Sequence, residues 1–372
     1  MKLNKIKSTI LLYLAVINFT ACSDWTEIES VNETDLNGTI KTEEYYAALR
    51  DWKKTPNLPQ VFVWFDNWNG ISPTGENSLR GLPDSVTIAS NWGTPKFGIS
   101  PECKADMEYV QKVKGTKVVV TSFANSVGRD VEWKEIYDIG NSSDPEVVRP
   151  AVKAYAEAIY DAVVADGFDG FDWDYEPSGG GGTGNYLWKN KVQRTLFVEE
   201  LTYWFGKGAT DPMRDRGDRK PAKPGLLLLI DGEISNMDKE WLSYYVDYFV
   251  LQAYGGSGLS GRVNTVISRL QHWIDEGKLT TEEAVRRTIL TENFESYAGT
   301  GGGFLNMSKY IHKSNGVDQQ IGGCGIYRVG FDYNQGKGDY NGSPEYYFLR
   351  QGITNLYHIY YDRLNNLQGE NE

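Results

Sequence analysis

The stretch DGFDGFDWDYEP, residues 166–177, alternates acidic and aromatic side chains through its second half. Successive side chains of a β-strand point to opposite faces. Asp172, Asp174 and Glu176 would therefore share one face of a strand, and the aromatic residues between them would share the other. In a closed barrel one face of each strand points inward and the other packs under surrounding helices. The stretch therefore predicts a barrel strand whose acids line the interior.

Seven further strand-like apolar runs occur along the chain, with helical patterns between them. Together with residues 167–176, the runs are 60–68, 85–92, 117–123, 225–233, 248–256, 287–295 and 321–329. The clearest helical patterns are 42–54, 145–167, 188–208, 263–278 and 343–364. Eight such strands, each followed by a helix or loop, predict an α/β fold, a (β/α)8 TIM barrel, rather than a doubly wound open sheet. The acidic strand would end at the carboxyl-terminal rim, where active sites of this architecture lie.

The amino-terminal segment has the features of an export signal. Lysines precede an apolar run from Ile10 to Phe19, which is too short to span a membrane, and Cys22 follows small residues. The pattern predicts a lipoprotein signal peptide over residues 1–21, with lipid attached to Cys22 and anchoring in the outer membrane. The acidic run after Cys22 favours exposure at the cell surface. A plain signal peptide, with Cys22 unrelated to it, is the alternative.

The rest of the chain reads as one catalytic domain behind a tether. Residues 22–55 predict a polar tether and a first helix, and residues 56–372 predict the barrel. Two glycine-rich stretches, 179–184 and 299–304, lack the Gly-Lys-Ser/Thr of a phosphate loop and follow no dinucleotide-binding turn. We expect both to be flexible loops at the barrel mouth.

Composition excludes several classes of function. The net charge of −12 leaves no positive field for phosphates, which argues against a nucleic-acid partner. With 3 His and 3 Cys at no ligand-like spacing, a zinc site is not expected. Cys103 and Cys324 could form a disulfide or remain two isolated thiols. Aromatic residues make up 13% of the chain, which suits either sugar binding or a large aromatic core.

Three carboxylates on one buried face repel each other, so burial should raise their pKa values and favour proton sharing. A neutral acid beside an ionised one is the arrangement that general acid catalysis needs. A cation site is one alternative, but the spacing lacks the glycine and the final glutamate of a calcium loop. A purely structural cluster is another, but three buried carboxylates would be destabilising without a function.

The same residues resemble a known family. DGFDWDYE, residues 169–176, matches D-G-x-D-x-D-x-E, the fourth-strand motif of family 18 glycoside hydrolases. KVVVTSFAN, residues 117–125, is similar to the third-strand motif, with Ser122 at the serine position but Ala124 and Asn125 in place of two glycines. LQAY, residues 251–254, resembles the sixth-strand motif. The resemblance covers residues 56–365.

The resemblance implies a retaining hydrolase in which the 2-acetamido oxygen of the substrate attacks C1. Glu176 would protonate the glycosidic oxygen and then deprotonate water. Asp174 would stabilise the oxazolinium, and Asp172 would share a proton with Asp174. Tyr254 would bind the acetamido oxygen, and Gln252 would support the same sugar. This scheme needs no cofactor and no metal.

Within the family, the sequence favours an endo-β-N-acetylglucosaminidase that cuts the diacetylchitobiose core of N-linked glycans. Tyr327 stands where chitinases commonly have a Trp, and Gly255 follows Tyr254 where they often have Asp. The chain between residues 295 and 324 is too short for the extra domain of many chitinases. A chitinase and a non-catalytic surface glycan binder are the alternatives, although the family's catalytic acids are retained.

Further sugar contacts are expected from Ser122, Asn125, Trp64 and Tyr327. Trp64, with Trp68 and Trp92, lies near the ends of the first two predicted strands, so these side chains could form sugar platforms or pack in the core. The expected partner is an N-glycan or another oligosaccharide that contains N-acetylglucosamine, bound by a monomer.

Overall fold

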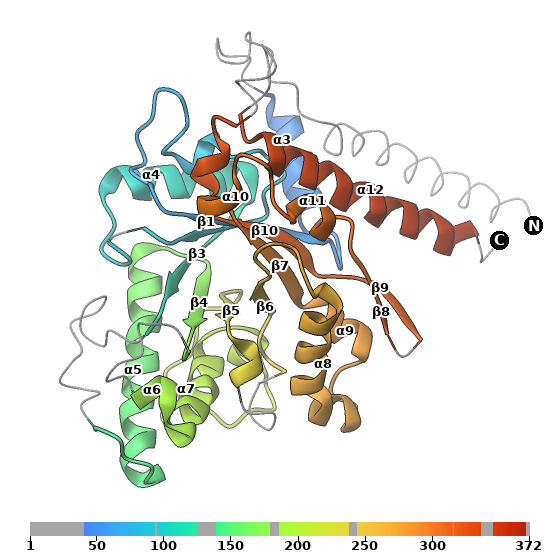
Figure 1. The fold of residues 1–372 in the computed structure, drawn as a ribbon. Coiled ribbons are helices and arrows are strands. Elements are labelled where there is room, and N and C mark those ends of the chain that lie inside the picture. Colours follow the sequence, from blue (N-terminus) through green and yellow to red (C-terminus); the bar gives the residue numbers. More distant parts are fainter. Residues whose placement is uncertain are drawn as a thin grey trace, which may run out of the picture.

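The computed structural model describes residues 41–93, 95–124, 139–178, 186–237, 244–314, 316–335 and 345–369. Eight parallel strands close into a barrel in the order β1-β10-β7-β6-β5-β4-β3-β2 (Figure 1). Their bounds are β1 Gln60–Phe65, β2 Ile88–Asn91, β3 Lys117–Ser122, β4 Gly170–Tyr175, β5 Leu227–Gly232, β6 Tyr248–Gln252, β7 Thr288–Asn293 and β10 Gly323–Tyr327. Each predicted strand contains one of them, which confirms the (β/α)8 barrel.

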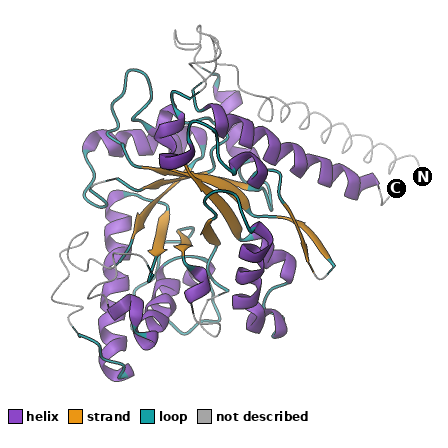
Figure 2. Cartoon of the chain, viewed as in Figure 1, coloured by secondary structure: helices purple, strands orange, loops and turns teal. Residues whose placement is uncertain are grey.

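Helices surround the strands (Figure 2). They are α3 Glu43–Trp52, α4 Pro101–Tyr109, α5 Pro145–Asp166, α6 Tyr186–Lys189, α7 Lys191–Trp204, α8 Leu259–Asp275, α9 Thr281–Arg286, α10 Phe294–Tyr297, α11 Phe304–Met307 and α12 Tyr347–Gly369. Shorter helical turns are η1 Leu79–Gly81, η2 Val110–Lys114, η4 Lys207–Thr210, η5 Ile234–Asn236 and η6 Val329–Asp332. The five predicted helices are present. The pattern at 188–208 is divided at Asn190, whose side chain caps α7 by accepting from the amides of Val192 and Gln193.

Local capping explains how the chain enters β4. The Asp144 side chain accepts from the amide of Glu146 and Pro145 occupies the first turn, which are favourable features at the start of a helix. Gly167 ends α5 with φ of 89°, a left-handed conformation that glycine adopts without strain. The turn at Gly167 leads directly into β4 and its acids.

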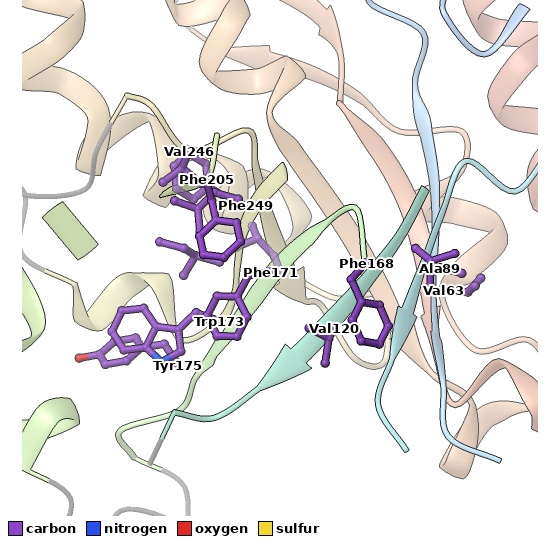
Figure 3. Close-up of a cluster of buried hydrophobic side chains, with 14 of the residues drawn as sticks. Val63, Ala89, Val120, Phe168, Phe171, Trp173, Tyr175, Phe205, Val246 and Phe249 are labelled. Atoms are coloured by element: carbon purple, nitrogen blue, oxygen red, sulfur yellow. The ribbon is translucent and has the colours of Figure 1, made fainter. Parts of the chain in front are cut away.

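The aromatic face of β4 packs outward against the helix layer. Phe171, Trp173 and Tyr175 are buried and point to the side of the strand where Phe205 lies (Figure 3). The Phe171 ring centroid is 5.8 Å from that of Phe205, and the Trp173 centroid is 5.1 Å from that of Phe197 on α7. The acidic face must therefore point into the barrel, as the alternation predicts.

A second, smaller apolar cluster fills the barrel interior. Its buried members come from six different strands and are Phe62, Trp64, Ile88, Val119, Leu229, Val250 and Ile289. They form an apolar floor below the acids, and apolar surroundings lower the local dielectric.

Between β7 and β10 the chain departs from the simple repeat. The helices there are the short α10 and α11, and an antiparallel hairpin follows, formed by β8 Ile311–Ser314 and β9 Val317–Gln320. Figure 1 shows this hairpin projecting from the barrel beside the end of α12. The sequence analysis did not predict it, because each strand is four residues long and polar residues interrupt its apolar pattern.

Cys103 and Cys324 are free and buried, so the isolated-thiol alternative holds. In the described part of the chain no helix combines the length and apolar character needed to cross a membrane. Residues 1–40, and with them Cys22, lie outside the described residues. The signal peptide, the lipidation and the tether therefore stay predictions.

Candidate active site

Four carboxylates gather at the carboxyl-terminal ends of β4 and β5. Asp172 and Asp174 are 0% and 4% exposed, and Glu176 follows the strand and is partly exposed at the rim. The parallel register sets Asp174 beside Asp231 of β5, which is 0% exposed. The structure therefore brings the three predicted acids together and adds a fourth.

Asp172 is held by neutral donors from other strands. Its Oδ2 accepts hydrogen bonds from the Thr121 hydroxyl at 2.8 Å and from the Trp64 indole Nε1 at 3.1 Å. Burial raises the pKa of Asp172 to about 6, while the bonds from Thr121, Asp231 and Trp64 oppose the rise. Asp172 thus has the raised pKa that the sequence predicts, with its charged form supported by neutral hydrogen bonds.

Asp174 and Asp231 share a proton-dependent contact. Burial is the main cause that raises the pKa of each carboxyl group well above its usual range. Repulsion from Glu176 raises the pKa of Asp174 further. Repulsion from Asp172 and Asp174 raises the pKa of Asp231 further. The hydrogen bond between them lowers the pKa of Asp174 and raises that of Asp231. The two carboxyl groups therefore favour sharing a proton, because both are buried and their negative charges repel each other.

Gln252 connects this pair to the rim. Its Nε2 donates to Glu176 Oε1 at 2.6 Å and to Asp231 Oδ1 at 3.2 Å. The same amide nitrogen donates both hydrogen bonds, so the Gln252 side chain links the carboxyl groups of Glu176 and Asp231 into one network. The predicted placement of Gln252 at the acid site agrees with this geometry.

Two tyrosines and a tryptophan form an aromatic wall beside Glu176. The rings of Tyr254 and Tyr327 are stacked with centroids 6.2 Å apart, and Trp92 Nε1 donates to the Tyr327 hydroxyl at 3.0 Å. Burial, followed by the negative charges of Asp231 and Asp174, raises the pKa of Tyr254 well above its usual range. Tyr254 is therefore a neutral hydrogen-bond donor close to the acids.

The predicted tryptophan platforms have different places. Trp64 is 2% exposed and sits in the barrel interior, where it donates to Asp172. Trp68 packs in the outer core and donates to Asp106 Oδ2 at 2.9 Å. For both residues the core-packing alternative is therefore correct, because their indoles face the interior of the fold. Trp92 alone of the three stands in the aromatic wall.

The residues of β3 alternate between the barrel interior and the outer core. On β3 the odd-numbered Val119 belongs to the barrel interior, whereas Val118 and Val120 belong to the outer core. Thr121 follows the inward parity and its hydroxyl bonds Asp172, whereas Ser122 has the outward parity and its sugar contact stays a prediction. The hydroxyl of Ser122 instead accepts from the amide of Ala124 at 3.2 Å. Asn125 lies outside the described residues.

With this geometry established, comparison with known proteins assigns the family. Residues 26–354 match the model of glycoside hydrolase family 18, BT1044-like. The chain belongs to glycoside hydrolase family 18.

Solved structures agree with the family 18 assignment. A glutamate-to-glutamine variant of BT1044 has 27% identity and a TM-score of 0.65, over 88% of this chain and 97% of that one. An endo-β-N-acetylglucosaminidase from Cordyceps militaris in apo form has 18% identity and a TM-score of 0.57, over 86% and 97% of the two chains. The second likeness extends to the fold alone. No curated protein matches the chain.

A buried glutamate that we did not predict organises the mouth of this family 18 barrel. Glu292, at the end of β7, is 0% exposed and accepts from three amides. These are Gly255 at 2.8 Å, Asn293 at 2.8 Å and Gly303 at 2.6 Å. Glu292 thus joins the segment that carries Tyr254 to the second glycine-rich stretch.

Within the glycine-rich stretch 299–304, which we expected to be a flexible loop, Gly301 and Gly303 are buried whereas Gly299, Thr300 and Gly302 are exposed. A Cβ built on Gly303 would lie 2.3 Å from the Cα of Gly256, and one on Gly302 would lie 2.7 Å from Glu292 Oε2. Glycine is needed here because the two backbones touch. The other stretch, 179–184, lies outside the described residues.

Cations occur at the rim of the family 18 site. Arg328 Nε donates to Asp66 Oδ2 at 2.7 Å, and its Nη1 donates to Glu295 Oε1 at 2.7 Å. Lys96 Nζ lies 3.8 Å from the centre of the Trp92 ring. The positive charge of Lys96 slightly opposes the raised pKa values of Asp172 and Asp174.

The described residues contain no candidate metal site, and one cavity lies far from the acids. Within the described ranges, no group of three or more His, Cys, Asp or Glu side chains could hold a metal ion. A cavity of about 480 Å³ lies at the amino-terminal ends of the strands, lined among others by Gln60, Lys117 and Tyr248. It is at the opposite end of the barrel from Glu176 and takes no part in the acid network.

Asp231 and Glu292 escaped the sequence analysis for different reasons. Asp231 ends the apolar run GLLLLID, so an acid at the carboxyl end of a barrel strand was a usable signal. Glu292 lies on the outward parity of β7, where a carboxylate has no sequence signal for burial. Its role depends on the amide of the neighbouring Asn293 and on amides from two loops, those of Gly255 and Gly303.

Proposed function

We propose that this family 18 protein is a retaining endo-β-N-acetylglucosaminidase that cuts the β-1,4 linkage in the diacetylchitobiose core of N-linked glycans. One observation carries the proposal: Glu176 stands at the rim, two residues after a buried Asp174, and Gln252 links it to Asp231, the neighbour of that aspartate. This is an acid–base group next to a carboxylate whose charge the site can control.

The proposed first step forms a bond between the acetamido oxygen of the sugar and its C1, while the C1–O bond to the leaving sugar breaks. Glu176, in its neutral form, gives its proton to the departing oxygen. In the second step water adds to C1, the oxazolinium opens to restore the acetamido group, and Glu176 takes the proton of the water. Two inversions at C1 retain the configuration.

Asp174 and Tyr254 serve the acetamido group in this proposal. The developing oxazolinium is positive, so an ionised Asp174 stabilises it through a charge interaction in a site of low dielectric. The Tyr254 hydroxyl, kept neutral by burial and by the nearby acids, donates to the acetamido oxygen. Asp172 contributes negative charge below Asp174 without touching the sugar.

The choice of substrate rests on the surroundings of the acids. Between β7 and β10 the described residues form α10, α11 and the β8–β9 hairpin, without room for an inserted domain. Tyr327 replaces a tryptophan floor and pairs with Trp92. A further Cordyceps militaris structure, an Asp→Asn, Glu→Gln double variant of the endo-β-N-acetylglucosaminidase, is described with bound fucosyl-N-acetylglucosamine-Asn, and its TM-score is 0.54. That ligand is of the class we propose here.

We further propose that the protein works as a monomer at the cell surface, attached to the outer membrane by lipid on Cys22. The support is the signal-like sequence of residues 1–21 and the acidic run after Cys22. Metabolic labelling with a radioactive fatty acid tests this point. Label that persists in a Cys22→Ala variant would contradict it.

The deciding experiment is mass spectrometry of glycans released from high-mannose and complex glycoproteins and from chitin oligomers. We expect released N-glycans that lack one core N-acetylglucosamine, which stays on the protein. Glu176→Gln should abolish release, whereas Glu108→Gln, on the far surface of α4, should not change it. Cleavage of chitin oligomers alone would identify a chitinase. Glycan binding without release by the wild-type protein would identify a non-catalytic binder.

A further inference from the structure

We propose that Asp231 is a positioning residue that holds the shared proton of the buried acid group and links that group to Glu176 through Gln252. This inference rests on the proposed function and deepens it. Asp231 lies outside the D-x-D-x-E stretch, on the neighbouring strand, and it does not reach the rim where a glycosidic bond would lie.

The position of Asp231 makes it the centre of the acid group. The register of β4 and β5 places Asp231 opposite Asp174, and Asp231 also bonds Asp172. Its Oδ1 accepts from Gln252, whose Nε2 also bonds Glu176. A change at Asp231 therefore reaches every member of the network through one hydrogen bond or two.

The unpaired oxygen atoms indicate where the proton is. Among the described residues, the buried oxygens Asp172 Oδ1, Asp174 Oδ1 and Asp231 Oδ2 have no hydrogen-bond partner. Leaving three such oxygens bare in a buried site would be strongly destabilising. Because Asp231 Oδ1 is already an acceptor, a proton on Oδ2 is the arrangement that supplies a donor to its neighbours.

The charges around Asp231 support the same assignment. The groups that face it are Asp172, Asp174 and Glu176 from β4 and its end, and Tyr254 from the segment after β6. Each is neutral or negative. The positive charge of Lys96 at the rim opposes the raised pKa of Asp172 and of Asp174. A proton on Asp231 would offset the remaining clustered negative charge.

A neutral Asp231 would help the reaction without changing its covalent steps. Its hydroxyl donates to the Asp174 carboxylate and keeps that group ionised as the oxazolinium forms. The proton stays on Asp231 throughout, so no bond to the substrate is made or broken there. Asn has the same shape and is permanently neutral: its Nδ2 can donate to Asp174 while its Oδ1 accepts from Gln252. Leu has neither ability.

These properties allow a sharp test with three variants. We expect Asp231→Asn to keep the kcat for glycan release within about tenfold and to move the alkaline limb of the pH–rate profile upward, because Asn cannot lose a proton. Asp231→Leu should lower kcat about 100-fold, the order found when one preorganised donor is removed, with a smaller change in KM. Asp247→Asn, which alters a half-buried aspartate at the other end of the barrel, should leave the profile unchanged. Equal losses in the Asn and Leu variants, or an unmoved alkaline limb in Asp231→Asn, would overturn the proposal.

A second readout does not need activity. The raised pKa of Asp231 means that the folded protein binds more protons than the unfolded chain above about pH 4, so stability falls as the pH rises toward the folded pKa. Asp231→Asn should flatten this fall in urea unfolding measured from pH 5 to 8. An unchanged slope would refute the role of Asp231 as the proton holder. Wild-type protein that releases no glycan would refute the proposed function while this readout still decides on Asp231.

Discussion

At the scale of single residues, the chemistry depends on acids that differ in environment rather than in type. Asp172 has hydrogen bonds from a hydroxyl and an indole, Asp174 lies beside Asp231, and Glu176 reaches the rim. Asp172 and Asp174, which have the same intrinsic acidity, therefore have different roles. Two substitutions test this division directly.

Asp174→Asn should lower kcat by about 100- to 1000-fold, because an amide cannot offset the positive charge of an oxazolinium. KM should change much less, since the charge develops after the sugar binds. Initial rates on a released-glycan assay measure both. Asp218→Asn, at a fully exposed position in the loop between α7 and β5, is the control and should behave as the wild type. Wild-type turnover in Asp174→Asn would contradict substrate assistance.

Thr121→Val should destabilise the protein by about 1–3 kcal/mol at pH 8, where Asp172 is ionised and loses a buried donor. Because the Thr121 bond lowers the pKa of Asp172, its loss should raise that pKa above about 6. The destabilisation should then shrink at pH 5, where the neutral carboxyl group does not require the bond. Urea unfolding at both pH values measures it, and Thr121→Ser is the matched control. Equal losses at the two pH values would show that packing, and not charge, is responsible.

At the scale of elements, the buried Glu292 at the end of β7 links the loop after β6 to the loop after β7. Its carboxylate accepts from the amides of Gly255, Asn293 and Gly303, and the first of these follows Tyr254 directly. The position of Tyr254 is therefore set by a residue of β7, although the tyrosine itself comes from the end of β6. The packed glycines fix the distance between the two loops.

Glu292→Gln should weaken this link between the two loops. The NH2 group of Gln is a donor, so it cannot accept the backbone hydrogen bond that one carboxylate oxygen of Glu292 accepts. We expect a loss of about 1–3 kcal/mol in unfolding free energy and a fall of about tenfold in kcat/KM. Chemical denaturation and initial rates measure the two effects. Glu295→Gln, an exposed change three residues away, tests whether burial is the cause. An unaffected Glu292→Gln variant would mean that the loops hold Tyr254 without it.

At the scale of the whole molecule, the barrel separates an outer aromatic core from a small inner cluster on which the acids rest. The Phe171–Trp173–Tyr175 face joins β4 to the helices, so the acidic face is held inward by the packing behind it (Figure 3). Cys103 and Cys324 lie in this outer core as free thiols. The reactivity of the two thiols therefore indicates whether the outer core is intact.

We predict that neither Cys103 nor Cys324 reacts with Ellman's reagent in the folded protein, and that both react once it unfolds in urea. Burial raises the pKa of each thiol and shields it from the reagent. A Cys22→Ser background removes the third thiol from the count. Rapid reaction before unfolding would indicate that the outer core opens locally. No reaction after unfolding would indicate a disulfide.

The sequence by itself determined the barrel and most of the acid site, because both follow from local pattern. Alternation over residues 171–176 assigns two faces, and eight apolar runs with helices between them suffice to predict the closed sheet. Corrections arose where parity or exposure depends on neighbours. Thr121, and not Ser122, faces the barrel interior because the pairing of β3 with β2 and β4 decides which of its residues point inward. The pairing of β1 likewise decides that Trp64 points inward.

The tertiary structure alone decided which residues complete the network. Asp231 stands beside Asp174 because β5 pairs with β4 in a particular register, although the two residues are 57 positions apart in the chain. Glu292 is satisfied by the amide of its neighbour and by amides from two loops, and Tyr327 meets Trp92 across the closure of the barrel. Such contacts join residues distant in the chain, so their free energy is gained only when the sheet closes. No local pattern encodes them.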